Sequence, residues 1–143
     1  MRNIGFIYAV AAAVTWGLVY AIDQKILTKV SPLSLLFVNS LLALIVTLPV
    51  LFWDLNSVKT LLASGKQNLI LIITSLLLGT AASFFIFSAI KNLDASTASI
   101  IEITYPIFVI LFSFLLFKQA INIYFALGAL LIFAGTVIVI KFG

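Results

Sequence analysis

The segment STASIIEITYPIFVILFSFLLF, Ser96 to Phe117, decides the fold class of this chain. A helix needs about 20 apolar residues to cross the roughly 30 Å hydrocarbon core of a bilayer, and this segment meets that requirement. It is too long and too uniformly apolar for the alternating strands of an outer-membrane barrel. Because a bilayer interior offers no water to unpaired backbone groups, the segment is predicted to cross the membrane as a helix.

The composition of the whole chain indicates an integral membrane protein. Of the 143 residues, 64% are hydrophobic and 8% are charged, and the mean hydropathy is +1.34. A soluble domain carries roughly 25% charged residues. The net charge of +4 would favour nucleic-acid binding in a soluble protein, but here the basic residues are scattered singly near the ends of apolar segments. We therefore expect them to anchor helix ends, and we expect no nucleic-acid partner.

Four further segments share this length and apolar character. We therefore expect an all-α, polytopic membrane protein whose five transmembrane helices form one domain over residues 1–143. The expected spans lie near residues 4–22, 32–53, 69–90, 96–117 and 121–140. The first segment begins like a signal peptide, but its apolar run continues and four spans follow, which favours an uncleaved helix.

Helix-capping residues mark several of the span boundaries. Ser31-Pro32 opens the second span with proline in a tolerated first-turn position. Asp94, with the Ser and Thr residues after it, supplies capping side chains before the fourth span. The connection over residues 54–68 is long enough for either a small interfacial helix or a solvated loop.

The basic residues divide evenly between the two faces of the membrane. Five spans place four basic residues on the face of the N-terminus and four on the opposite face: Arg2, Lys59, Lys66 and Lys118 against Lys25, Lys29, Lys91 and Lys141. Lys and Arg in short loops normally stay cytoplasmic, so an even division removes the main signal that selects one orientation. We hypothesise dual topology, in which oppositely inserted chains form antiparallel pairs; the alternative is one orientation chosen by subtler signals.

Short motifs recur in a definite order along the chain. The second half contains Leu93-Asp94-Ala95-Ser96, then Tyr105-Pro106, then Leu127-Gly128-Ala129 and Ala134-Gly135; the first half contains Thr15-Trp16-Gly17 and Ser31-Pro32. In this order and spacing they resemble a single EamA-type unit of the drug/metabolite transporter superfamily, over nearly the whole length. The resemblance implies one half of a ten-helix inverted-repeat transporter, which must pair with a second copy or with a related five-helix chain.

Two positions depart from the pattern of that superfamily. Many members carry an Arg in the second span, where this chain has Asn39, and an acidic residue in the last short loop, where it has Lys118-Gln119. An anionic substrate needs a positive partner in a low-dielectric site. We therefore do not expect a sugar phosphate or a nucleotide sugar as substrate.

Glu102 is the residue predicted to couple transport to protons. A charged side chain inside a span costs on the order of 3 kcal/mol, and all 8 basic residues lie near span ends, so no permanent ion pair is expected within one copy. Desolvation favours the neutral carboxyl group, which could then bind and release a proton. Pro106 lacks the N–H that would bond the carbonyl of Glu102, which adds a backbone acceptor. The alternative is a permanently protonated Glu102 that hydrogen-bonds a neighbouring helix.

Polar and aromatic residues on the first and fourth spans are predicted to line a cavity beside Glu102. Ser99 and Tyr105 share its helix face, and Trp16 lies too near mid-membrane for an interfacial aromatic belt. The predicted substrate-binding residues are Trp16, Thr15, Tyr8, Tyr20, Asn39, Ser99, Tyr105 and Pro106. Three alternatives remain open: core packing for Trp16, a cross-helix hydrogen bond for Asn39 and a plain kink for Pro106.

Small residues at regular spacing predict helix-packing faces. Ser75, Gly79 and Ser83 repeat every four residues in the third span, and Gly128 and Gly135 lie seven residues apart in the fifth. Such residues let two helix backbones approach closely.

These observations favour transport over catalysis. The chain has no His and no Cys, and we find no intramembrane carboxylate pair and no Gly-rich phosphate loop, so we expect no enzyme activity, metal or cofactor. We expect a secondary transporter in the plasma or inner membrane, where it contacts lipid and exchanges protons at Glu102 against a small metabolite or an amphipathic or cationic compound. The alternatives are a proton-independent facilitator of a neutral metabolite and a non-transporting subunit that packs against a larger partner.

Overall fold

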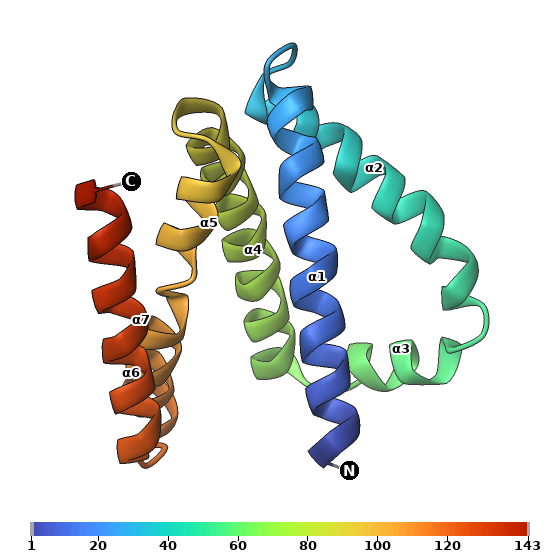
Figure 1. Cartoon of the computed structure of the whole chain (residues 1–143). Helices are drawn as coiled ribbons and strands as arrows, with labels where there is room; N and C mark the ends of the chain where they lie inside the picture. The colour runs from blue at the N-terminus through green and yellow to red at the C-terminus, as the bar shows by residue number, and fades with distance from the viewer. Residues whose placement is uncertain (1, 143) are drawn as a thin grey trace. The chain divides into compact units, whose positions relative to one another are not determined.

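The computed structural model describes residues 2–142, with side chains described from Ile4 onwards, so the Arg2 side chain of the charge comparison lies outside them. Helices make up this range, and no strand occurs in it. In chain order they are α1 (Arg2–Leu27), α2 (Pro32–Leu51), α3 (Leu55–Leu62), α4 (Lys66–Asn92), α5 (Ala95–Glu102), α6 (Tyr105–Phe117) and α7 (Ile123–Phe142) (Figure 1).

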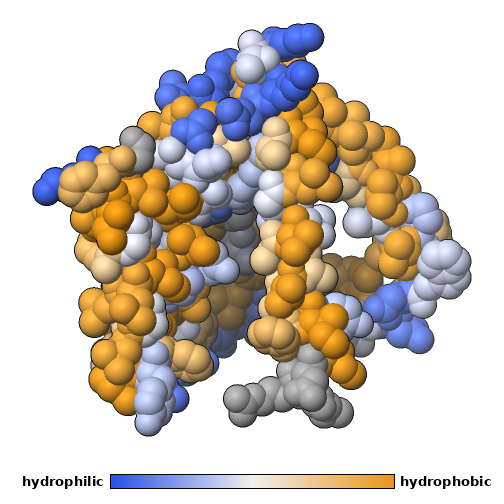
Figure 2. All heavy atoms as spheres, in the orientation of Figure 1, coloured by the Kyte–Doolittle hydropathy of each residue, from blue (hydrophilic) through white to orange (hydrophobic). Residues whose placement is uncertain are grey.

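Five segments of the described chain are long and apolar enough to cross a membrane. Four of these segments lie in the single helices α1, α2, α4 and α7. The remaining one, Ala95–Phe117, is the fourth in chain order and consists of α5 and α6 together. The predicted all-α fold with five transmembrane helices is thereby confirmed. Figure 2 shows hydrophobic side chains along the length of α7 and hydrophilic ones gathered near helix ends, as expected for helices surrounded by lipid.

The first helix is longer than the hydropathy of the sequence indicates. The predicted span stops at residue 22, whereas α1 continues to Leu27, which is 1% exposed. The side-chain carbonyl of Gln24 accepts a hydrogen bond of 3.0 Å from the backbone N–H of Ala95, so a tertiary contact holds this last part of α1. As a result Asp23, a polar residue outside the predicted span, lies within the helix.

The connection between the second and third spans contains the short helix α3, so it is not a plain loop, and a location of this helix at the membrane interface stays a prediction. Leu55, Val58 and Leu62 recur at helical spacing and give α3 one apolar side. The connection ends at Gly65, directly before α4. The φ of Gly65 is +93°, in a region that residues with a Cβ atom rarely adopt.

The described chain groups into two compact units. One contains residues 2–25 and 89–142, and the other contains residues 26–88, with α2, α3 and most of α4. In the first unit α7 contacts both α5 and α6. The Thr136 hydroxyl of α7 donates to the backbone carbonyl of Ile100 in α5 at 3.1 Å, and Thr136 itself is buried. This first unit contains Glu102 and the α1 residues Trp16, Tyr20 and Asp23.

Asp94 is the N-cap of α5. Its Oδ1 accepts the Thr97 backbone N–H at 2.9 Å, and its Oδ2 accepts the Thr97 hydroxyl at 2.7 Å. These two hydrogen bonds, the backbone one first, lower the pKa of Asp94 below its ordinary value. The capping role predicted from the sequence agrees with this geometry.

Replacing Asp94 by Ala is expected to lower the thermal stability of the protein in detergent, because α5 loses its cap. A carboxyl group whose pKa is lowered by folding stabilises the fold above its ordinary pKa, and that contribution is lost as the pH falls through the lowered value. The difference in melting temperature between wild type and D94A, followed by circular dichroism, should therefore shrink on acidification. Asp54→Ala is the matched control, since Asp54 precedes α3 without a side-chain capping bond. Equal losses of melting temperature in D94A and Asp54→Ala would contradict the assignment of Asp94 as the N-cap of α5.

Candidate functional site

The fourth span is interrupted directly after Glu102. Helix α5 ends at this residue and α6 begins at Tyr105, with Pro106 in its first turn (Figure 1). Across the interruption, hydrogen bonds span three residues instead of four: Thr104 donates to Ile101 at 3.2 Å, and Ile107 donates to Thr104 at 3.0 Å. Because proline has no N–H, the Glu102 carbonyl lacks its usual donor four residues ahead. The kink predicted from Pro106 is therefore a break between two helices.

The carboxyl group of Glu102 meets the first helix at Tyr20. The Tyr20 hydroxyl donates a hydrogen bond of 2.7 Å to Oε2 of Glu102, and both residues are partly buried. The Trp16 ring lies against the Tyr20 ring, with centroids 5.6 Å apart and planes tilted by 50°. Tyr105 is also close enough to Tyr20 to interact with it electrostatically. Four of the predicted site residues thus gather at the break between α5 and α6.

The position of this cluster is fixed by polar contacts at both ends of α5. At the N-terminal end, Gln24 of α1 accepts from the N–H of Ala95, which is one of the donors that a helix leaves unpaired in its first turn. At the C-terminal end, Glu102 accepts from Tyr20. Two hydrogen bonds from one face of α1 therefore hold the short helix that carries the carboxyl group.

Asp23 is a site residue that the sequence interpretation missed. It is 4% exposed, and its Oδ2 atom has no hydrogen-bond partner among the described residues. The sequence interpretation ended the first span at residue 22, whereas α1 runs past Asp23, and the segment Ile4–Leu27, which is long and apolar enough to cross a membrane, includes this second carboxylate. Helical spacing contained the signal, since Asp23 follows Tyr20 by three residues and Trp16 by seven, which places all three on one face.

Two of the predicted hydroxyl ligands bond to their own helices. The Thr15 hydroxyl donates to the carbonyl of Ala11 at 2.8 Å, and the Ser99 hydroxyl donates to the carbonyl of Ser96 at 2.9 Å. Tyr8 lies on α1 two helical turns or more before the Trp16 and Tyr20 pair and is largely exposed. These three residues do not join the cluster around Glu102 through any contact that the structure records.

The remaining two predicted site residues are Asn39 and Pro106. Asn39 is an exposed residue of α2, within the unit of residues 26–88. Pro106 faces α7, where it lines a shallow groove with Val109, Tyr124, Phe125 and Gly128. The role of Asn39 in substrate binding therefore stays a prediction, and Pro106 acts on Glu102 through the backbone.

The predicted helix-packing glycines are open to their surroundings in one copy of the chain. A Cβ atom built on Gly79, Gly128 or Gly135 would meet no described atom within 4 Å other than the adjoining residues and backbone of its own helix. The Ser83 hydroxyl donates to the carbonyl of Gly79 at 3.0 Å, within the same helix. Ser75 lies one turn before Gly79 on the same face. Packing of these faces stays a prediction that concerns a second chain.

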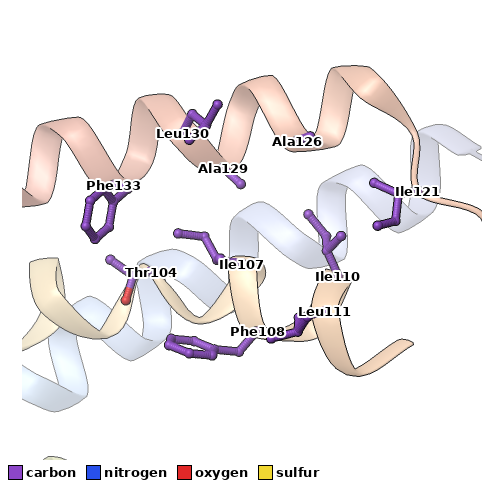
Figure 3. Close-up of a pocket in the computed structure, with 10 residues that line it drawn as sticks. All are labelled: Thr104, Ile107, Phe108, Ile110, Leu111, Ile121, Ala126, Ala129, Leu130 and Phe133. Carbon is purple, nitrogen blue, oxygen red and sulfur yellow. The ribbon is translucent and has the colours of Figure 1, made fainter. Parts of the chain in front are cut away.

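A separate, apolar groove of about 560 Å³ lies between α6 and α7 (Figure 3). Its lining residues are Thr104, Ile107, Phe108, Ile110, Leu111, Ile121, Ala126, Ala129, Leu130 and Phe133. Thr104 is its polar member, and the Thr104 hydroxyl already donates to the carbonyl of Ile101 at 2.8 Å. The groove thus suits apolar chains such as those of lipids, whereas the polar candidate site lies at Glu102 and Tyr20.

Five apolar spans, one of them broken beside a partly buried acid, define a polytopic α-helical membrane protein with a polar site inside its helices. The chain matches the EamA-like transporter family over residues 3–141 and belongs to that family of membrane transporters. The predicted resemblance to one EamA-type five-helix unit is confirmed. No curated protein and no solved structure matches the chain.

Proposed function

We propose that this chain is a proton-coupled secondary transporter whose coupling group is the Glu102 carboxyl. The observation that carries the proposal is the hydrogen bond of 2.7 Å from Tyr20 to Glu102, located where the fourth span is broken. An acid inside a span marks an ion or proton pathway by default. Its recorded partner is a neutral phenol, which leaves the carboxyl group able to exchange a proton.

The chemistry around Glu102 favours a small amphipathic or cationic compound as the substrate. An ionised carboxylate attracts a positive group, and the faces of Trp16 and Tyr105 offer cation–π contacts. The negative charge of Glu102 and the aromatic rings do not favour an anion. Substrate and proton would then compete for the same carboxylate, which is the basis of exchange.

The helix break supplies a place where the site can change shape. Residues Ile103 and Thr104 separate α5 from α6, and hinges are formed by a few loop or helix-terminal residues of this kind. Movement of α6 relative to α5 at this point would alter access to Glu102. The two hydrogen bonds between α1 and α5, one donated by Tyr20 and one donated by the Ala95 N–H, would hold α5 during this movement.

The active form in this proposal is an antiparallel pair of five-helix units in the plasma or inner membrane. Support comes from the even division of basic residues between the two faces and from glycine faces without a close neighbour in one copy. The second unit is a second copy or a related five-helix chain. Alternating access would then arise by rocking the two units around the midplane site.

Reconstitution into liposomes with an imposed pH gradient tests the proposal. We expect cationic amphipathic compounds from a chemical panel to move against protons, seen as an internal pH change with a trapped dye, and we expect an ionophore that dissipates the gradient to stop net accumulation. Uptake of a neutral metabolite at a rate that does not depend on the pH gradient would contradict proton coupling and indicate a facilitator instead. Absence of any transport, together with co-purification of a larger membrane protein, would replace it with a non-transporting subunit.

A further inference from the structure

Asp23 is a buried acid that the proposed function does not use. It is 4% exposed, and its Oδ2 atom has no hydrogen-bond partner in the part of the chain that the structure describes. The chain has 4 acidic residues: Asp54 is exposed, Asp94 caps α5, and Glu102 accepts from Tyr20. Burying a carboxylate that has an unpaired oxygen is costly, and a group in that position takes up a proton or binds a cation instead.

The position of Asp23 connects it with Glu102 through Tyr20. Asp23 lies one helical turn beyond Tyr20 on the same face of α1 and is close enough to interact with Tyr20 electrostatically. The hydroxyl of Tyr20 in turn donates to Glu102. The next residue, Gln24, bonds α5, so this turn of α1 is held against the helix that carries Glu102. Two acids, one from each helix, thus flank a single phenol.

We propose that Asp23 is a second proton-binding carboxyl group of the site, so that the site holds two exchangeable protons, one on α1 and one on α5. Proton uptake forms an O–H bond at Oδ2, with the proton drawn from water, and release returns it without any electron transfer. With both acids ionised the site carries two negative charges, which favours a substrate with strong or double positive charge. Only the coupling of Asp23 to cargo rests on the proposed function, whereas its proton binding can be measured without transport.

Several other charged and titratable groups belong to the same unit as Asp23 and Glu102. They are Tyr20 and Lys25 on α1, Lys91 near the end of α4, Asp94 before α5, and Tyr105 at the start of α6. Lys25 and Lys91 each have an interaction of their own. A permanent ion pair with either lysine would lower the pKa of Asp23 and keep it ionised throughout the range above the ordinary aspartate pKa, and this is the competing state that an experiment must separate.

Isotope-edited infrared spectroscopy on the full chain in nanodiscs makes this separation. Aspartate labelled with 13C at the side-chain carboxyl shifts the C=O stretch of every protonated Asp away from that of Glu102. The lowered pKa of Asp94 keeps that residue ionised near neutral pH, and the variant Asp54→Asn tests whether the exposed Asp54 contributes to the band. We expect one labelled C=O band at neutral pH, its loss on raising the pH, its absence in Asp23→Asn and its persistence in Asp54→Asn and Glu102→Gln.

Each outcome decides the proposal. No labelled band at any pH above the ordinary aspartate range would show a permanently ionised Asp23 and overturn it, as would a band that survives Asp23→Asn. Should D23N fail to fold, the other two Asp residues can be tested in its place. Loss of the labelled band in Asp54→Asn or Asp94→Asn would assign the band to that residue and overturn the proposal, whereas its persistence in both would leave Asp23 as its source. A clear Asp23 band together with normal flux in Glu102→Gln would refute the proposed function while leaving this inference in place.

Trp16 offers an independent optical measurement. Its ring contacts Tyr20, and Trp53→Phe removes the other of the chain's 2 Trp residues. In that background we expect the fluorescence of Trp16 to titrate in two steps, and in one step when either Asp23 or Glu102 is neutralised. A single step in the parent that Asp23→Asn leaves unchanged would contradict the second proton.

Discussion

Replacing Glu102 by Gln is expected to abolish proton-linked flux in reconstituted liposomes while leaving expression, membrane insertion and pairing intact. The amide has nearly the size of the carboxyl group, and its carbonyl oxygen can still accept the Tyr20 hydroxyl, whose bond to Glu102 is 2.7 Å long. An amide cannot take up or release a proton near neutral pH, so the coupling step is lost. The measurement is the internal pH change that accompanies substrate entry.

Two control variants distinguish loss of the Glu102 proton from loss of another acid or of the hydrogen bond to Tyr20. Asp54→Asn neutralises an exposed acid before α3 and should leave coupled flux at the wild-type level. Tyr20→Phe removes the donor and keeps the carboxyl group; hydrogen bonds between membrane helices contribute about 0.6 kcal/mol on average, so the variant should stay folded and retain coupled flux at a changed rate. Unchanged coupled flux in Glu102→Gln would refute the role of Glu102.

Hydropathy predicted the membrane spans correctly because the bilayer imposes length and composition on any helix that crosses it. It placed the end of the first span too early, since hydropathy falls at Asp23 whereas the helix depends on local geometry and on the contact between Gln24 and Ala95. That error concealed Asp23. A single sequence does not show which polar residue beyond an apolar run is held inside by a tertiary hydrogen bond.

Helical periodicity predicted which residues share a face but not what their side chains bind. It grouped Trp16 with Tyr20 and placed Glu102 opposite them, in agreement with the recorded contacts. It also grouped Ser99 with Glu102, yet the Ser99 hydroxyl bonds the carbonyl of Ser96. Ser and Thr in helices frequently bond to a carbonyl three or four residues back, and periodicity carries no information about that competition.

Removing a single lysine is expected to convert the chain from two orientations in the membrane to one. The basic residues divide four against four, so Lys29→Gln leaves three on its face and should direct that face outwards, with the C-terminus outside. Lys59→Gln on the opposite face should give the reverse. Lys29 and Lys59 are exposed, so neither change disturbs packing. A compartment-specific reporter attached after Gly143, a position outside the described residues, measures the orientation.

The functional consequence of this prediction separates pairing in opposite orientations from pairing in parallel. If antiparallel pairs are the active form, each lysine variant expressed alone should lose transport, because all of its copies insert the same way, and co-expression of the two variants should restore it. Lys29→Arg and Lys59→Arg keep the charge balance and should behave as wild type. A wild-type reporter signal from one compartment alone, or full transport by either singly oriented variant, would rule out the antiparallel homodimer and leave pairing in parallel or pairing with a related chain.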